Sequence, residues 1–204
     1  MPINTNPWNR LRYTLWAPFY DAVGGLFDAR RQESIRRLDL RPRERVLLVG
    51  AGTGGDLPFF PAGCRLLATD LTPAMLRRAR PRLRDGMHLA LMDGHELGVR
   101  TGAFDAVVLH LILAVLPDPR RCLREAARAL RPGGRIAVFD KFAPSRQPPL
   151  VLRAVNVVAN ALFTDVTRYL PDIVEGSGAP LVVERDEAAL LGGLFRYVRM
   201  RKVE

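Results

Sequence analysis

The chain has few cysteines and no long apolar run. Its two cysteines, Cys64 and Cys122, stand far apart, and the sequence contains neither a CxxC pair nor a Cys/His cluster. Neither a disulfide framework nor a zinc site is indicated, so we interpret both cysteines as core thiols and expect no metal. No stretch reaches the roughly 18 apolar residues that span a bilayer, and the N-terminus lacks a signal peptide's apolar core and cleavage site. We expect the protein to stay in the cytoplasm.

Lysine is nearly absent as well. Lys141 and Lys202 are the only two, so arginine carries almost all the positive charge of a chain with formal net charge +10 and pI ≈ 10.8. Such a surface favours anionic partners, namely nucleic acid, anionic lipid or an acidic substrate. An arginine preference can equally reflect codon composition, and most charged faces are simply solvated, so the charge leaves both interpretations open.

Length and composition indicate one globular domain. The 204 residues are 48% hydrophobic and 25% charged, with no low-complexity tract and no repeat. We expect a single domain over residues 1–204 that consists of four parts. These are an N-terminal helical cover (1–44), a core (45–140), a helical lid (142–178) and a C-terminal hairpin (180–204).

Short apolar runs alternate with helical periodicity through the core. Strands are predicted at residues 45–50, 65–69, 87–91, 104–109 and 135–139. Thr72-Pro73 offers an N-cap and a first-turn proline for one helix, and Pro119 opens another that Pro132-Gly133-Gly134 stops. This alternation predicts an α/β, Rossmann-like, doubly wound and mostly parallel sheet of seven strands. Its last two strands, 180–183 and 194–200 joined through 186–193, are predicted to form an antiparallel edge hairpin.

A glycine-rich turn follows the first strand. In Gly50-Ala51-Gly52-Thr53-Gly54 the glycines let the backbone approach a ligand, and the helix expected next presents free N–H groups to an anionic end. The glycine spacing differs from the G-x-G-x-x-G of NAD enzymes, which disfavours a dehydrogenase. Asp70 ends the second strand about 20 residues further on, where a carboxylate can accept hydrogen bonds from both ribose hydroxyls. The pattern predicts an adenosine ligand.

Five segments in order make the resemblance specific: GAGTG, TDLTPAML, MDGHEL, FDAVVLHLILAVLPDP and LRPGGRIAVFD. Over residues 45–140 they resemble the motif series of class I S-adenosylmethionine (SAM) dependent methyltransferases. Trp16-Ala17-Pro18-Phe19-Tyr20-Asp21 and the tail GGLFRYVRMRK are similar to segments of ubiquinone/menaquinone C-methyltransferases and bacterial phosphatidylethanolamine N-methyltransferases. The resemblance implies methyl transfer with SAM as cofactor and S-adenosylhomocysteine as product.

The resemblance also implies roles for single residues. The glycine run would line the methionine part, Asp70 would hold the ribose, and Asp93 would accept from the adenine amino group. His110 would lie near the sulfonium, and Tyr20 and His110 are the candidate catalytic bases. The complete predicted cofactor set is Gly50, Ala51, Gly52, Thr53, Gly54, Asp70, Leu71, Met75, Asp93, Gly94, His95 and His110. His110 could equally be a structural histidine, and Asp70 and Asp93 could instead cap the segments that follow them.

One position departs from the family pattern. Relatives often have an acid two residues before the first glycine, where this chain has Leu48. Asp56 could substitute for it, either by facing the SAM amino group or by capping the next helix.

Asp140, at the tip of the fifth strand, is a third candidate for proton handling and could pair an ammonium group or Lys141.

The acceptor has to be inferred from the appended segments. A short helix from Asn6-Pro7 would place Trp8, Leu11 and Leu15 on one face, with Arg10 and Arg12 available for phosphates, as in interfacial anchors. Residues 150–163 are strongly apolar. We expect a lipophilic acceptor, either a phospholipid amine or a quinol ring, with peripheral contact to an anionic membrane. A small soluble metabolite as acceptor and a noncatalytic SAM-binding partner subunit remain alternatives. No nucleic-acid partner is expected, because the stretch after the fourth strand reads His110-Leu111-Ile112-Leu113 and not Asn/Asp-Pro-Pro-Tyr/Phe. The oligomeric state is not indicated.

Overall fold

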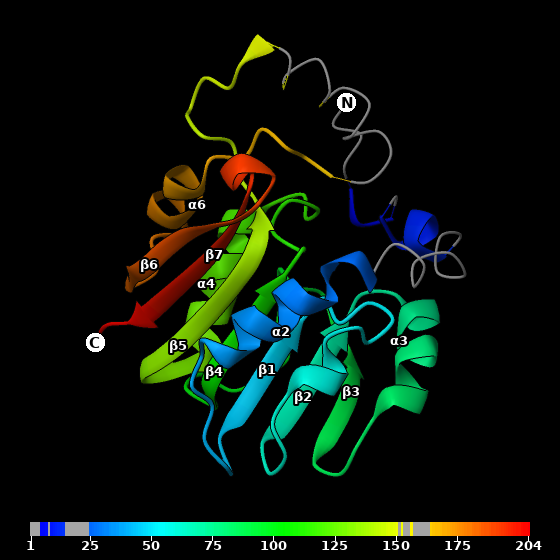
Figure 1. Cartoon of the computed structure of the whole chain (residues 1–204). Helices are drawn as coiled ribbons and strands as arrows, with labels where there is room; N and C mark the ends of the chain where they lie inside the picture. The colour runs from blue at the N-terminus through cyan, green and yellow to red at the C-terminus, as the bar shows by residue number, and fades with distance from the viewer. Residues whose placement is uncertain (1–4, 8, 15–24, 151, 153–155, 157–163) are drawn as a thin grey trace.

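A seven-stranded sheet forms the centre of the protein (Figure 1). The computed structural model describes residues 5–7, 9–14, 25–150, 152, 156 and 164–204. The strands are β1 (Arg45–Val49), β2 (Arg65–Asp70), β3 (Met87–Leu91), β4 (Phe104–His110), β5 (Leu130–Lys141), β6 (Leu181–Leu190) and β7 (Phe195–Lys202). Their order is β3-β2-β1-β4-β5-β7-β6, and β1 to β5 are parallel while β7 is antiparallel to both neighbours. The predicted doubly wound sheet with an antiparallel edge is confirmed.

Helices cover both faces of this sheet. The α-helices are α2 (Asp28–Arg36), α3 (Pro73–Ala79), α4 (Pro119–Ala129) and α6 (Leu170–Ser177). Short 3-10 turns are η1 (Gly25–Phe27), η2 (Leu57–Phe59), η3 (Arg80–Arg82) and η4 (Leu191–Gly193). Residues 6–7 and 9–14 are also helical. None of the helices in the described residues combines the length and hydrophobicity that crossing a bilayer requires.

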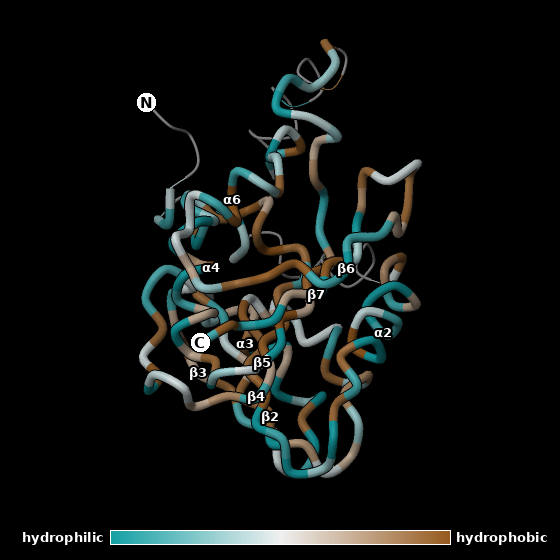
Figure 2. The backbone as a smooth tube through the Cα atoms, turned by 90° about the vertical axis from the view of Figure 1, so that its left-hand side faces the viewer, coloured by the Kyte–Doolittle hydropathy of each residue, from teal (hydrophilic) through white to brown (hydrophobic). Residues whose placement is uncertain are grey.

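Successive residues of β1 are buried on opposite faces. Val46 and Leu48 join a core cluster with Ile35 of α2, whereas Leu47 and Val49 belong to the cluster under α4 and α6. A strand buried on both faces reads as a continuous apolar run, which explains the RVLLV sequence. In Figure 2 the hydrophobic colour accordingly gathers along the central strands. Leu48, at the family's acidic position, is fully buried in this packing.

The C-terminal hairpin is longer than the sequence predicts. Residues 186–190, assigned to the connection, continue β6 instead, with register irregularities at Val183/Arg185 and Ala188/Leu190 that keep it paired to β7. Asp186 holds this extension by accepting a hydrogen bond from Arg196 Nε at 2.5 Å. The turn itself is confined to η4, where Gly192 and Gly193 have positive φ.

No α-helix directly follows the glycine turn, contrary to the prediction. Residues 52–56 form turns that lead into the three-residue η2. Pro58 is tolerated in the first turn of η2, but Pro61 lacks the N–H group that a continuing helix needs and favours the extended conformation of Phe60, so the segment stops after one turn. A helix dipole is therefore not available here to hold a ligand anion, and a side chain has to supply that charge.

Two further predictions about local structure are refined. Thr72 occupies the N-cap position of α3, but its side chain makes no capping bond; Asp70 Oδ1 instead accepts from Thr72 N at 2.8 Å. Within the predicted lid, α6 packs on α4, with Leu170 and Ile173 in the same core cluster. Most of residues 151–163 lie outside the described part of the chain.

Candidate cofactor and acceptor pocket

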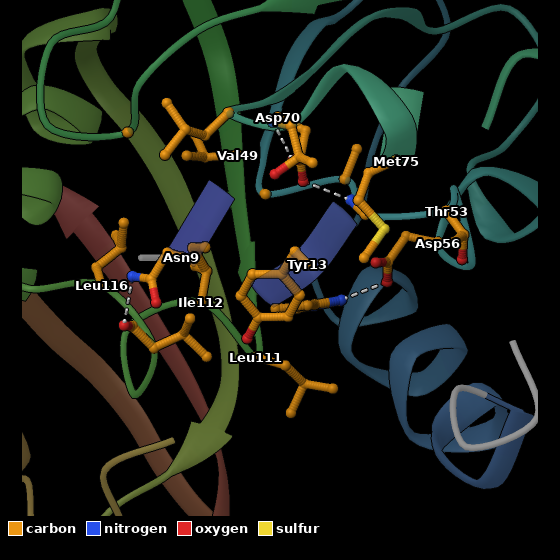
Figure 3. Close-up of a pocket in the computed structure, with 18 of the residues that line it drawn as sticks. Asn9, Tyr13, Val49, Thr53, Asp56, Asp70, Met75, Leu111, Ile112 and Leu116 are labelled. Atoms are coloured by element: carbon orange, nitrogen blue, oxygen red, sulfur yellow. Dashed lines mark hydrogen bonds and ion pairs between the residues drawn. The ribbon is translucent and has the colours of Figure 1, made fainter. Parts of the chain in front are cut away.

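A cavity of about 840 Å³, partly open to solvent, lies at the carboxyl ends of β1, β2 and β4. Its walls come from the turns after these strands, from α2 and from the N-terminal helical residues (Figure 3). Ligands of doubly wound folds bind at this edge of the sheet. Of the predicted residues, those that line the cavity are Gly50, Ala51, Gly52, Thr53, Asp70, Leu71, Met75, Gly94 and His110.

The glycine turn brings the backbone to the cavity wall. The N–H groups of Gly50 and Ala51 both donate to Thr69 O at 2.8 Å, which folds the turn back over β2. Gly50 has φ 76°, a conformation that an L side chain rarely adopts, and an added Cβ would lie 2.7 Å from Ile112 Cδ1. A side chain at this position would therefore be strained and would collide with the opposite wall.

We predict that Gly50→Ala destabilises the fold by roughly 2–4 kcal/mol, the sum of backbone strain and overpacking. Gly178→Ala is the matched control, because Gly178 has φ 62° but an added Cβ would meet nothing within 4 Å. Urea unfolding of both variants separates the two contributions, because backbone strain affects both variants and overpacking affects only Gly50→Ala. Equal losses in the two variants would show that the contact with Ile112 costs nothing.

Asp70 joins the turns that follow β1 and β2. Its Oδ2 accepts from Gly52 N at 2.9 Å and its Oδ1 accepts from Thr72 N at 2.8 Å. Burial raises the pKa of this carboxyl above its usual range, and the backbone hydrogen bonds from Thr72, Gly52 and Leu71 offset only part of that effect. Each oxygen retains acceptor capacity, so Asp70 can still bind two hydroxyl groups in the cavity.

A buried Asp–His–Ser chain lies beside the glycine turn. His110 Nδ1 is 2.6 Å from Asp56 Oδ1, and His110 Nε2 is 2.9 Å from Ser34 Oγ. Burial raises the pKa of Asp56, but the charge and hydrogen bond of His110 and the charge of Arg31 outweigh it and hold that pKa below its usual value. Asp56 is thus an ionised group in the cavity wall, and it makes no helix-capping bond. Both ring nitrogens of His110 are engaged by protein partners.

Three predicted cofactor residues do not line the cavity. Gly54 packs inward, where an added Cβ would lie 2.9 Å from Leu57 and 3.0 Å from Ala79. Asp93 Oδ1 binds the backbone N–H and Nδ1 of His95 at 2.9 and 2.7 Å, while His95 Nε2 accepts from Asp118 N at 3.2 Å. Asp93 and His95 thereby tie the turn after β3 to the start of α4.

The other candidate bases lie elsewhere. Asp140 is fully buried and accepts from the backbone N–H groups of Ala114 and Lys141, so it holds the loop after β4. Its carboxylate is also 3.9 Å from Lys141 Nζ. Tyr20 lies outside the described residues.

Several lining residues were not predicted from the sequence. Asn6, Asn9 and Tyr13 close the cavity from the N-terminal side, and Figure 3 shows the Tyr13 ring among the other labelled side chains. Arg31 of α2 also lines it; its side chain is only 7% exposed, and its Nε has no hydrogen-bond partner among the described residues. One arginine among many gives no local signal that singles Arg31 out.

Comparisons with known proteins agree with this geometry. Residues 47–138 match the family described as methyltransferase domain. A phosphatidylethanolamine N-methyltransferase of Cereibacter sphaeroides is 31% identical over 93% of this chain and 95% of its own length. The chain belongs to the SAM-dependent methyltransferases.

Other relatives of this methyltransferase extend the comparison. A demethylmenaquinone methyltransferase of Corynebacterium urealyticum is 30% identical, over 76% of this chain and 74% of its own length. A putative methyltransferase from Bacillus halodurans C-125 has the same fold, with TM-score 0.70, 17% identity, and coverage of 86% of this chain and 100% of that one. The cofactor is SAM, and the sequence-based assignment to this superfamily is confirmed.

The cavity fits this cofactor on two structural observations. SAM carries an anionic carboxylate at one end and an adenosyl group at the other. The buried Nε of Arg31 and the buried Oδ1 of Asn6 both lack hydrogen-bond partners within the described chain. Arg31 Nε can only donate a hydrogen bond, which matches the carboxylate end of SAM. Asn6 Oδ1 can only accept one, which matches the adenosyl end.

Proposed function

We propose that this methyltransferase acts on a lipophilic acceptor at a membrane surface, and that the acceptor is a phospholipid amine. The observation that carries the proposal is a cavity that has an apolar wall and, besides Asp70, a second carboxylate, Asp56, whose pKa is held below its usual value. The relative from Cereibacter sphaeroides, named for phosphatidylethanolamine methylation, matches over nearly its whole length and supports the same class.

The cofactor end of the cavity is assigned first. Bound SAM supplies an electrophilic methyl group on its sulfonium. In our proposal Asp70 accepts from the ribose hydroxyls, Leu71 and Met75 flank the adenine, and Gly50 and Gly52 allow the methionine part close to the backbone. Arg31 donates to the methionine carboxylate, in place of the absent helix N-terminus.

The acceptor end is apolar. After β4 the chain contributes Leu111, Ile112, Val115 and Leu116 to the cavity wall. Leu111 also packs on a second apolar cluster, in which Phe27 of η1 lies 5.3 Å from Phe195 of β7. Leu26 and Leu191, in the 3-10 turns beside these two rings, are 77% and 66% exposed. Leu111 thus connects the cavity wall to an apolar cluster whose neighbouring turns expose two leucines, an arrangement that suits a lipid substrate.

The N-terminal helical residues have an inverted polarity that fits this proposal. Arg12 is buried and donates to Asn9 Oδ1 at 2.7 Å, whereas Leu11 is 53% exposed beside the exposed Arg10. Arg12 is therefore not the phosphate contact that the sequence suggests. An exposed leucine next to an arginine is instead suited to a lipid headgroup region.

Asp56 favours an amine over a quinol. An ammonium headgroup is attracted to an ionised carboxylate, and it must lose a proton before its nitrogen can attack the methyl group. Because both nitrogens of His110 are engaged, we propose that His110 orients Asp56 and keeps it ionised, and that Asp56 binds the acceptor amine. The amine releases its proton to solvent through the open side of the cavity, its nitrogen then bonds to the methyl carbon, and S-adenosylhomocysteine leaves with the electron pair of the broken S–C bond. Quinol methylation is the second candidate, because relatives named demethylmenaquinone methyltransferase match three quarters of this chain.

We expect radiolabelled methyl groups from SAM to appear in phosphatidylethanolamine when the protein is incubated with vesicles of phosphatidylethanolamine and phosphatidylglycerol. A parallel reaction contains vesicles of phosphatidylcholine that carry a demethylated menaquinol. Labelled lipids are separated by chromatography. Label in the quinol, or only in added soluble metabolites, would contradict the phospholipid assignment.

The double variant Leu26→Asp/Leu191→Asp tests the membrane contact separately. We expect vesicle methylation to fall roughly 30-fold, because each of the two exposed leucines contributes on the order of 1 kcal/mol to interfacial binding. Binding of S-adenosylhomocysteine should be unchanged, because neither residue lines the cavity. Unchanged flotation of this variant with vesicles would rule out these leucines as the docking surface.

A further inference from the structure

Asn6 has a fixed amide orientation. Its Nδ2 donates to Asp93 Oδ2 at 2.5 Å. A carboxylate can only accept hydrogen bonds, so the nitrogen side of the amide must face Asp93 and the oxygen must face away from it. The direction of Asn6 Oδ1 therefore follows from the chemistry of its neighbour.

Asn6 Oδ1 is a buried acceptor without a donor. It is shielded from solvent and has no hydrogen-bond partner within the described chain, although Asn6 lines the cavity. Buried acceptors are nearly always satisfied, and an unsatisfied one at a binding site indicates that the ligand brings the donor. The residue lies at the end of the cavity formed by Gly94 and Met92, next to β3.

We propose that Asn6 Oδ1 accepts a hydrogen bond from the exocyclic amino group of adenine and so determines the base specificity of the cofactor site. This inference rests on the proposed arrangement of SAM in the cavity. The amino group is the base's only exocyclic donor, whereas hypoxanthine presents a carbonyl oxygen there and would face Asn6 Oδ1 with a second acceptor. A single atom, Asn6 Oδ1, then selects adenine over hypoxanthine.

This assignment gives Asp93 and His95 an indirect role. The backbone N–H of Asp118 binds His95 Nε2, His95 Nδ1 donates to Asp93, and Asp93 accepts from Asn6 Nδ2. Asp93 is thus a positioning residue that turns the Asn6 oxygen toward the ligand. Asn6 thus contacts the adenine base, and the turn after β3 holds the Asn6 side chain in place.

The test is a comparison of two ligands by isothermal titration calorimetry. For the full-length wild-type protein we expect S-adenosylhomocysteine to bind at least about tenfold more tightly than S-inosylhomocysteine, as sites built around one hydrogen bond discriminate by this much or more. In Asn6→Leu, which keeps the side-chain size but has no acceptor, the ratio should approach one through loss of S-adenosylhomocysteine affinity.

Asn9→Leu is the matched control. Asn9 lines the same cavity from the same segment, but its Oδ1 is bonded to Arg12. We expect both ligands to lose affinity together in this variant, with the ratio preserved. An unchanged affinity ratio in Asn6→Leu overturns the inference. Equal binding of the two ligands by the wild-type protein also overturns it, and that measurement does not depend on a variant that folds. If neither ligand binds the folded wild-type protein, the cofactor arrangement itself fails, a result distinct from loss of discrimination.

Discussion

Replacing Asp70 with alanine is expected to weaken S-adenosylhomocysteine binding by roughly 100- to 10,000-fold. Two charge-assisted hydrogen bonds to the ribose would be lost, and each contributes about 1.5–3 kcal/mol. The same change removes the acceptors of Gly52 N and Thr72 N, so the turns after β1 and β2 lose their common anchor. Both changes lower the affinity for S-adenosylhomocysteine.

Isothermal titration calorimetry measures this loss, with two further variants for comparison. Asp70→Asn keeps the side-chain shape and one acceptor, so its affinity should fall between the wild type and Asp70→Ala. Asp85→Ala removes one exposed acid in the turn before β3 and is expected to leave affinity unchanged. Near-wild-type binding by a folded Asp70→Ala protein would exclude Asp70 as the ribose ligand.

The pKa of Asp70 adds a pH dependence. Because burial raises this pKa, the carboxyl takes up its proton at a higher pH than an exposed aspartate does. A protonated oxygen is a poorer acceptor, so affinity for S-adenosylhomocysteine should decrease as the pH falls through the raised pKa. Asp70→Asn has no such group, and its affinity should lack this component of the pH profile.

Local sequence was enough to predict which strand ends line one cavity. Gly50 and Asp70 lie at the ends of consecutive parallel strands, and such strand ends always meet at one edge of the sheet. The order of strands and turns along the chain is therefore enough to predict that both groups line one cavity, as they do. His110 reaches the same edge from β4, although its partners Ser34 and Asp56 could not be predicted from spacing.

The parts that depend on long-range packing were not predicted. Asn6 and Tyr13 reach the cavity from the chain's beginning, across a sequence separation that carries no pattern. The family resemblance implied that Asp93 binds the adenine amino group, yet its carboxylate is hydrogen-bonded to His95 and Asn6. Strand-end position predicts which residues come near a ligand, but competition among neighbouring polar groups decides which of them contact it.

Arg31→Met should weaken S-adenosylhomocysteine binding about 50-fold, the effect of losing one buried charge-assisted contact with a carboxylate. The turn after β1 supplies no helix N-terminus, and Arg31 lies so close to it that a Cβ added at Gly55 would be 2.3 Å from Arg31 Nη1. Arg31 forms long ion pairs with Asp28 and Asp56, at 3.5 and 3.9 Å. Its buried Nε has no hydrogen-bond partner among the described residues, so this donor remains available to a ligand anion.

A second ligand identifies the group that Arg31 binds. 5′-Methylthioadenosine contains the adenosyl part without the amino acid, so its affinity should be the same in the wild type and in Arg31→Met. Arg31→Lys retains the charge without the planar fork and should recover part of the S-adenosylhomocysteine affinity. If Arg31→Met weakened both ligands equally, Arg31 would be supporting the fold of α2 over the cavity, and the methionine carboxylate would have to be bound by another group.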